Sequence, residues 1–191
     1  MPEYAVTIRL LEPMLGTVPK NPGIYSAYIE TKKPKENAED ESVTVEAIEE
    51  KGWTGFHRDE AGYFMYDYMV LGFMKEAGNV MKDTLGIKAL RKKIENFVMV
   101  TPRRIRLPEP SGTIERPLRA QTAMGERVSL ARSDYIDAET EINFTLNVLQ
   151  QKELTEKTIQ AILEYGRRKG LGQWRNGGYG RFEVVNFVLN A

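Results

Sequence analysis

The clearest hydrophobic pattern of the chain lies in its last third, where apolar and polar residues alternate strictly from Glu141 to Leu149. Alternation with a period of two is typical of a strand that buries one face. A similar alternation runs from Tyr4 to Leu11, near the start of the chain. Two further apolar segments, Phe97 to Arg106 and Arg181 to Leu189, also predict strands.

Apolar residues spaced three and four positions apart predict helices between these strands. One helical region extends from Asp67 to Asn96 and is divided near Gly86. A second extends from Thr155, a suitable capping residue, to Lys169, and Gly170 is placed to end it. The order of strand, helix, strand, strand, helix, strand is that of the ferredoxin-like (RRM-like) fold. We therefore expect an α+β protein with a βαββαβ domain, in which four antiparallel strands carry two helices on one face.

Two stretches fall outside this order. Residues 13–62 begin with several prolines and become strongly polar, so we interpret them as an insertion or protruding element within a single domain that spans residues 1–191. Within them, the turn-like Asp59 to Gly62 predicts a hairpin with aromatic arms. The polar segment from Thr113 to Tyr135, with a turn near Gly125, predicts another hairpin.

Composition removes several classes of function. The 191 residues contain no cysteine, which excludes disulfides, thiolate metal sites and cysteine nucleophiles. We find no metal-binding motif and expect neither a metal nor another cofactor. No apolar run is long enough to cross a membrane and the N-terminus lacks the features of a signal peptide, so we expect a cytoplasmic protein without a membrane partner. The net charge of zero argues against a protein that coats nucleic acid by bulk charge.

The stretch GLGQWRNGGYGRFEV, residues 170–184, places five glycines within eleven positions just before the last predicted strand. Glycines gather where the backbone needs a positive φ or where another group approaches the main chain closely. This loop follows a helix and opens a strand, the reverse of the phosphate-binding loops of nucleotide-binding proteins, so we reject an NTPase or dinucleotide site. Trp174 and Tyr179 offer stacking surfaces while Arg175 and Arg181 offer cations, the two kinds of contact that hold single strands. The alternative is a plain helix-to-strand connection in which Trp174 and Tyr179 pack on the core.

This loop resembles the glycine-rich loop of the RAMP superfamily (repeat-associated mysterious proteins), the RNA-binding subunits of CRISPR effector complexes. VTIRLLEPMLGT is similar to the first strand and following loop of that family, and YDYMVLGFMKEAG to its first helix. The resemblance is nearest to the single-domain backbone subunits that polymerise along a guide RNA, and it extends to a stand-alone relative from a phage or mobile element. It implies non-catalytic binding of single-stranded RNA or DNA, with self-association of copies head to tail along the strand. The residues expected to bind the nucleic acid are Lys75, Arg103, Arg104, Arg106, Arg167, Arg168, Lys169, Gly170, Gly172, Trp174, Arg175, Gly177, Gly178, Tyr179, Gly180 and Arg181.

Two other functions stay open. His57, the only histidine, is a candidate general base for a metal-independent endoribonuclease, although a surface histidine without a partner constellation is the simpler interpretation. Some members of the family cut RNA with a loop aspartate, whereas the loop after the first strand here has Glu12 as its nearest acid, which argues against cleavage. The other hypothesis is a structural or inhibitory protein that mimics a RAMP subunit and binds only protein. The aromatic run from Tyr63 to Tyr68 is then either its interface or part of the core.

Overall fold

The computed structural model describes residues 2–20, 53–122, 125–149 and 151–190 of the chain. These residues form a mixed α+β structure that contains multiple antiparallel sheets. The middle of the predicted insertion at 13–62, residues 21–52, lies outside the described residues, so its interpretation as a protruding element stays a prediction.

A four-stranded sheet forms the centre of the described structure, with the strand order β12-β1-β11-β7 and antiparallel pairing throughout. Its strands are β1 (Glu3–Leu10), β7 (Val98–Thr101), β11 (Glu141–Val148) and β12 (Phe182–Asn190). Each of these strands was predicted from the sequence. The second one is shorter than expected, because the chain leaves this sheet after Thr101 and Pro102 and joins another.

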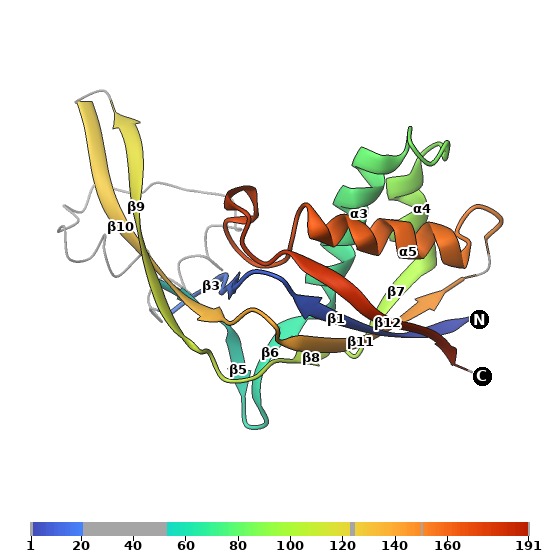
Figure 1. Cartoon of the computed structure of the whole chain (residues 1–191), viewed down its shortest axis with the longest axis horizontal. Coiled ribbons are helices and arrows are strands. Elements are labelled where there is room, and N and C mark those ends of the chain that lie inside the picture. Colours follow the sequence, from blue (N-terminus) through green and yellow to red (C-terminus); the bar gives the residue numbers. More distant parts are fainter. Residues whose placement is uncertain (1, 21–52, 123–124, 150, 191) are drawn as a thin grey trace, which may run out of the picture.

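Helices α3 (Asp67–Met81), α4 (Leu90–Phe97) and α5 (Glu156–Glu164) cover one face of this sheet, as Figure 1 shows. The Thr155 side chain caps α5 as expected, because its hydroxyl accepts a hydrogen bond from the backbone N–H of Thr158. The helix ends at Glu164 rather than at Lys169, and the 3₁₀ turn η1 (Tyr165–Arg167) continues it. No helix among the described residues has the length and apolar character needed to cross a membrane.

The hydrophobic core lies between the helices and the central sheet. On β1 and β11 every second side chain is buried, and Ile8 and Leu146 are fully inaccessible to solvent. Phe182 of β12 is also buried and packs edge-on against Phe73 of α3. The other face of the sheet carries exposed and half-exposed polar side chains such as Asn143. The period-two pattern of the sequence thus reports the single buried face of this sheet.

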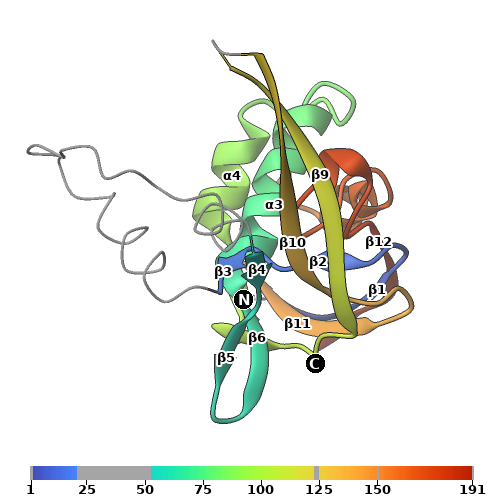
Figure 2. The same ribbon diagram turned by 90° about the vertical axis from the view of Figure 1, so that its left-hand side faces the viewer.

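A long hairpin of β9 (Gly112–Thr122) and β10 (Gly125–Ile136) projects from the body of the protein (Figures 1 and 2). It is the hairpin predicted at 113–135. The short strands β2 (Met14–Leu15), β3 (Val18–Pro19) and β4 (Trp53–Gly55) join its sheet. Since β2 and β4 both pair with the last residues of β10, the two described ends of the 13–62 segment meet at the base of the hairpin.

A third sheet consists of β5 (His57–Asp59), β6 (Gly62–Tyr66) and β8 (Arg104–Arg106). β5 and β6 form the hairpin that the turn at Asp59 to Gly62 predicts, and in Figure 1 it extends below the central sheet. β8 pairs with β6, so Ile105 is buried while Arg104 and Arg106 are exposed. The chain after Pro102 therefore carries its arginines onto this third sheet.

Replacing Phe144 with alanine should destabilise the protein strongly, because the ring is only 4% exposed and belongs to the core between sheet and helices. We expect a loss of about 3–5 kcal/mol in the free energy of unfolding, measured by urea denaturation. The control is Asn143→Ala on the exposed face of the same strand. It loses one exposed hydrogen bond with Thr7 and should cost less than about 1 kcal/mol. Similar losses for the two variants would contradict this location of the core.

Candidate nucleic-acid interface

The glycine-rich loop, residues 170–181, connects η1 to β12 and lies beside the base of the hairpin (Figure 1). It contains the short 3₁₀ turn η2 (Arg175–Gly177). Its two ends meet, because the Leu171 N–H donates a hydrogen bond of 3.0 Å to the Gly180 carbonyl. The loop is also docked on the chain that follows β1, since Gly180 N–H donates to Pro13 and Gln173 N–H donates to Leu15. The loop is therefore closed and anchored rather than free.

Two glycines at the ends of the loop are required by this close approach of backbone segments. A Cβ on Gly170 would lie 1.9 Å from the carbonyl carbon of Gly180, and a Cβ on Gly180 would lie 1.9 Å from the Leu171 oxygen. Gly180 also has a φ of +69°, in the left-handed region that favours glycine. Packing within the protein is sufficient reason for these two residues to be glycine.

The glycines further along the loop divide into two kinds. Gly172 has a φ of +81° and its Cβ would lie 2.5 Å from the Leu15 oxygen, so it too serves the docking of the loop. At Gly177 and Gly178 no atom lies closer than 3.7 Å to the position of a Cβ. These two are therefore not explained by a close approach of backbone segments, although Gly178 has a φ of +89°.

Trp174 lies at the tip of the loop and its side chain is 39% exposed. The guanidinium carbon of Arg116, a residue of β9, lies 3.6 Å from the centroid of its ring. Tyr179 is half-buried beside them, with its ring centroid 6.1 Å from that of Trp174. Neither aromatic residue belongs to the hydrophobic core. The indole is thus presented at the surface and held by a cation from the hairpin.

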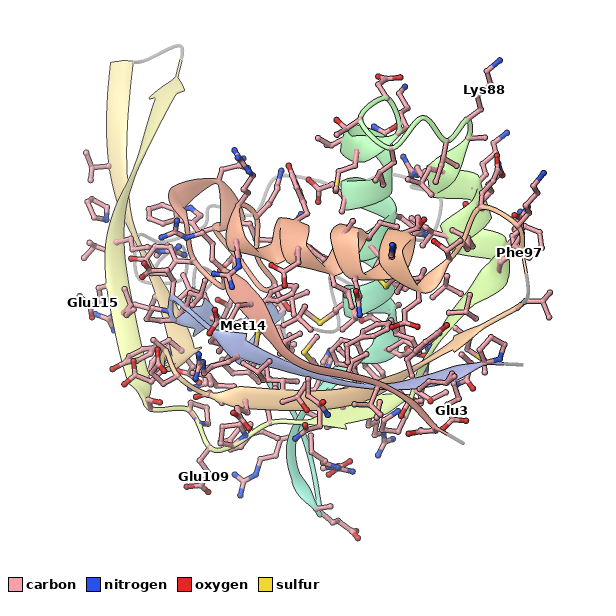
Figure 3. All side chains as sticks on the ribbon, turned by 45° about the vertical axis from the view of Figure 1, so that its right-hand side comes forward. Glu3, Met14, Lys88, Phe97, Glu109 and Glu115 are labelled. Carbon is pink, nitrogen blue, oxygen red and sulfur yellow. The ribbon has the colours of Figure 1, made fainter. Side chains whose placement is uncertain are left out.

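Arg116 is buried, with 4% of its surface exposed. It follows Glu115, whose side chain points away from the body of the protein (Figure 3), so the alternation of β9 directs Arg116 inward. Its Nη2 donates a hydrogen bond to the Ser133 hydroxyl, whereas Nε and Nη1 have no hydrogen-bond partner among the described residues. Burial lowers the pKa of Arg116 from its usual value, partly offset by Tyr179. The ring of Trp174, at 3.6 Å, and that of Tyr179, at 5.9 Å, also compensate this desolvated cation.

Neutral polar side chains complete the junction between loop and hairpin. The Gln173 side-chain oxygen accepts hydrogen bonds from the hydroxyls of Thr54 and Ser133, both at 3.0 Å. Those two hydroxyl oxygens lie 2.8 Å apart, and since each hydroxyl has a single proton, a hydrogen bond between them replaces one of the two to Gln173. β4, β10 and the glycine-rich loop are therefore joined by one polar network next to Arg116.

A hollow of about 620 Å³ lies beside Trp174 and is lined by Lys169, Trp174, Arg175, Asn176 and Gly177. A second hollow of about 310 Å³ shares Arg175 and extends to Glu76 and Tyr68 on α3. Between them, these two neighbouring hollows are lined by an indole, a phenol and two cations. This combination suits the binding of single strands by stacking and by phosphate contacts.

Nearly all the cations that the sequence analysis selected are paired with a carboxylate. The pairs are Lys75–Glu95, Arg103–Asp67, Arg104–Asp59, Arg106–Asp59, Arg167–Glu164, Arg167–Glu183, Lys169–Glu76, Arg175–Glu76 and Arg181–Glu12. Within the described residues, Arg168 has no ion-pair partner. The surface around the loop is therefore a set of ion pairs rather than a uniformly positive groove.

Glu76 of α3 is a carboxylate in direct contact with the loop. Its Oε1 lies 2.5 Å from Lys169 Nζ and its Oε2 lies 2.7 Å from Arg175 Nη1. Desolvation raises the pKa of Glu76, but the hydrogen bonds from Lys169 and Arg175 outweigh it and hold the pKa below its usual value. The two cations of the larger hollow thus share one negative charge.

The arginines that follow Pro102 are placed on the third sheet and near the start of α3. Arg103 is ion-paired with Asp67 and lies over the rings of Tyr66 and Tyr68, which stack on each other at 5.3 Å. Tyr68 is 51% exposed and lines the smaller hollow together with Arg175. Tyr68 is therefore the point at which the surface of the third sheet borders the glycine-rich loop.

Other predicted residues lie away from this border. Lys75 points from α3 toward Glu95 of α4, whereas Glu76 next to it faces the loop. His57 is half-buried on β5, stacks on Phe64 and contacts Tyr66 edge-on, and desolvation lowers its pKa. The aromatic run is split between two roles, since Phe64 is buried and Tyr68 is exposed.

Two residues at the site were missed by the sequence analysis. Arg116 lies in a polar strand without a distinctive pattern, and Glu76 is an ordinary acidic residue on an amphipathic helix. No local signal distinguishes either one. Only the pairing of β9 with β10 and the packing of α3 beside the loop bring them to Trp174 and Arg175.

No protein-family model matches the sequence, and no curated protein matches it. Among solved structures, a chain in the cryo-EM structure of the Type III-B Cmr-beta bound to cognate target RNA is similar, with a TM-score of 0.58 and 13% sequence identity. The similarity covers 98% of this chain but 60% of that chain, so this protein spans less than two thirds of its length. At this identity the similarity shows a shared fold.

Replacing Gly180 with alanine should disrupt the loop, because the new Cβ would meet the Leu171 oxygen at 1.9 Å and the backbone has a φ of +69°. We expect a loss of at least about 1–3 kcal/mol in the free energy of unfolding, measured by urea denaturation. Gly177→Ala is the matched control and should change stability by less than about 0.5 kcal/mol, since its nearest neighbour lies 3.7 Å away. A neutral Gly180→Ala would show that the loop is not closed in this way.

Stability should also depend on Asp59 in a pH range that its ion pairs define. The hydrogen bond from Arg106 above all, with another from Arg104, lowers the pKa of Asp59 from 3.8 to about 2. A carboxylate with a lowered pKa stabilises the folded state above its unfolded pKa, and this contribution is lost as the pH falls from 3.8 to about 2. Asp59→Asn should therefore lower the Tm at neutral pH but not at about pH 2.

Circular dichroism melting at a series of pH values measures this difference. Asp83→Asn removes an exposed carboxylate that has no ion pair among the described residues, and it should leave the Tm nearly unchanged. A Tm difference for Asp59→Asn that persists at about pH 2 would be inconsistent with the ion pairs to Arg104 and Arg106.

Proposed function

We propose that this protein binds single-stranded RNA, without cutting it, on the surface formed by the glycine-rich loop and the start of α3. The observation that carries the proposal is the position of Trp174. Its indole is 39% exposed, is held by Arg116 at 3.6 Å, and lines a hollow of about 620 Å³ together with Lys169 and Arg175. A fixed aromatic ring beside cations is what a sequence-tolerant single-strand site needs, because every base has a face to stack and every nucleotide a phosphate.

The fold proposed for this function is a ferredoxin-like (RRM-like) domain of the RAMP type. The order β12-β1-β11-β7, with α3 and α4 between β1 and β7 and with α5 between β11 and β12, agrees with a split βαβ arrangement. The similarity to a chain of Type III-B Cmr-beta, a complex solved with its target RNA, supports a RAMP-like assignment.

In the proposed complex, Trp174 and Tyr68 stack on bases. Lys169 and Arg175 contact the phosphates. The absence of side chains at Gly177 and Gly178, where the Cβ position has no neighbour closer than 3.7 Å, leaves room for a strand at the tip of the loop. Arg103, beside Tyr68, extends the path toward Arg104 and Arg106. Assembly of copies along one strand stays a prediction. The number of copies bound to long and to short RNAs tests it.

Trp174→Ala should weaken the binding of a fluorescently labelled single-stranded RNA, measured by anisotropy at low and moderate salt. Loss of one base stack is worth about 1–3 kcal/mol, or roughly a 5- to 150-fold increase in Kd. Trp174→Phe keeps a ring over Arg116 and should retain part of the affinity. Leu149→Ala removes an exposed apolar side chain elsewhere and should bind like the wild type.

Thermal melting of each variant separates loss of binding from loss of folding. The same titration with single-stranded DNA of equal sequence shows whether the site distinguishes the two polymers. If the folded wild type does not bind either polymer even at low salt, the protein-binding hypothesis is favoured, because phosphate contacts are strongest there. If wild type and Trp174→Ala bind RNA with equal affinity, the glycine-rich loop is not part of the binding site.

A further inference from the structure

Glu76 forms ion pairs with both cations of the larger hollow, an arrangement that RNA binding by itself does not require. Glu76 comes from α3, Lys169 from the segment between η1 and the loop, and Arg175 from the loop itself. Both cations line the hollow beside Trp174. The carboxylate offers one oxygen to each cation. A phosphodiester likewise carries two non-bridging oxygens on a single atom, so the carboxylate presents to these cations the same chemistry as a phosphate group.

All members of this triad can be reached by a ligand. The side chains of Lys169, Arg175 and Glu76 are 27%, 32% and 32% exposed. Ion pairs that stay partly exposed are partly screened by solvent, and part of their attraction is offset by desolvation, so their net stabilisation is modest. A phosphate that approaches Lys169 and Arg175 therefore competes with Glu76 at a modest cost.

We propose that Glu76 acts as an internal substitute for a phosphate, occupying Lys169 and Arg175 until a nucleic acid strand displaces it. This inference rests on the proposed function of the loop. An isolated phosphate or a small anion gains too little from two cations that already share one carboxylate to displace it. A strand that also stacks on Trp174 and contacts other cations gains enough, so Glu76 makes the site selective for polynucleotides over small anions.

The lowered pKa of Glu76 is consistent with this role, because the carboxylate is kept charged by the same two cations. The triad carries a net charge of +1 rather than +2. Removing the charge of Glu76 therefore restores a cation to the hollow, whereas a purely structural role predicts that Lys169 and Arg175 lose their positions.

The test is the affinity of Glu76→Gln for a labelled single-stranded RNA of mixed sequence. The substitution keeps the shape of the side chain and removes its charge. We expect Kd to fall roughly two- to tenfold, the equivalent of one exposed ion pair. We also expect the slope of log K against log[salt] to become steeper by about 0.7, the value for one additional phosphate contact on a single strand.

The control is Glu153→Gln, which removes the same charge and breaks the ion pair with Lys93 on α4. It should change neither the affinity nor the salt slope by a comparable amount. A coupled substitution gives a second, independent measurement. Lys169→Gln should cost more affinity in the Glu76→Gln background than in the wild type, because Glu76 masks Lys169 only in the latter.

The outcomes separate this inference from the proposed function. If the wild type binds RNA through Trp174 but Glu76→Gln binds equally or more weakly, the inference is overturned and the function stands. If Glu76→Gln binds RNA that the wild type does not bind, the masking role is supported. If neither protein binds and both are folded, the inference and the proposed function fail together.

Discussion

The burial of one guanidinium group organises the candidate site. Arg116 lies at the base of the hairpin with 4% exposure and no carboxylate beside it among the described residues. Removing a cation from water is costly unless other groups compensate. Here the compensation comes from the rings of Trp174 and Tyr179 and from the Ser133 hydroxyl. Hairpin and loop consequently depend on each other, and the exposed indole of the loop is held by a residue of the hairpin.

Electrostatic balance is the second property of this surface. The chain has no net charge. Around the loop, too, most cations are paired with a carboxylate, so positive and negative charges lie side by side there. Cations that are paired in this way attract a polyanion weakly at a distance, because screening and neighbouring carboxylates reduce their field. Affinity must then come from short-range contacts, namely stacking on Trp174 and exchange of carboxylate for phosphate at Lys169 and Arg175.

The prediction of the fold from sequence succeeded where the evidence was local. The strands of the central sheet, the β5–β6 and β9–β10 hairpins and the positions of the helices follow from periodicity and turn residues. The prediction was less accurate where the chain changes partners. Pro102 indicates a bend after Thr101, but nothing in the pattern of residues 97–106 indicates that the chain pairs with β6 from Arg104 onward. Such pairing depends on segments that are distant in sequence.

The sequence by itself determined which segments become strands and helices, and it located the glycine-rich loop, because side-chain spacing and glycine act within a few residues. Only the tertiary structure decided what those glycines do and which charges face Trp174. Gly170, Gly172 and Gly180 are explained by backbone segments that touch, and Arg175 meets Glu76 across 99 positions of the chain. The physical reason is that a charge or a clash has consequences only once the chain has folded and another group lies within a few ångströms.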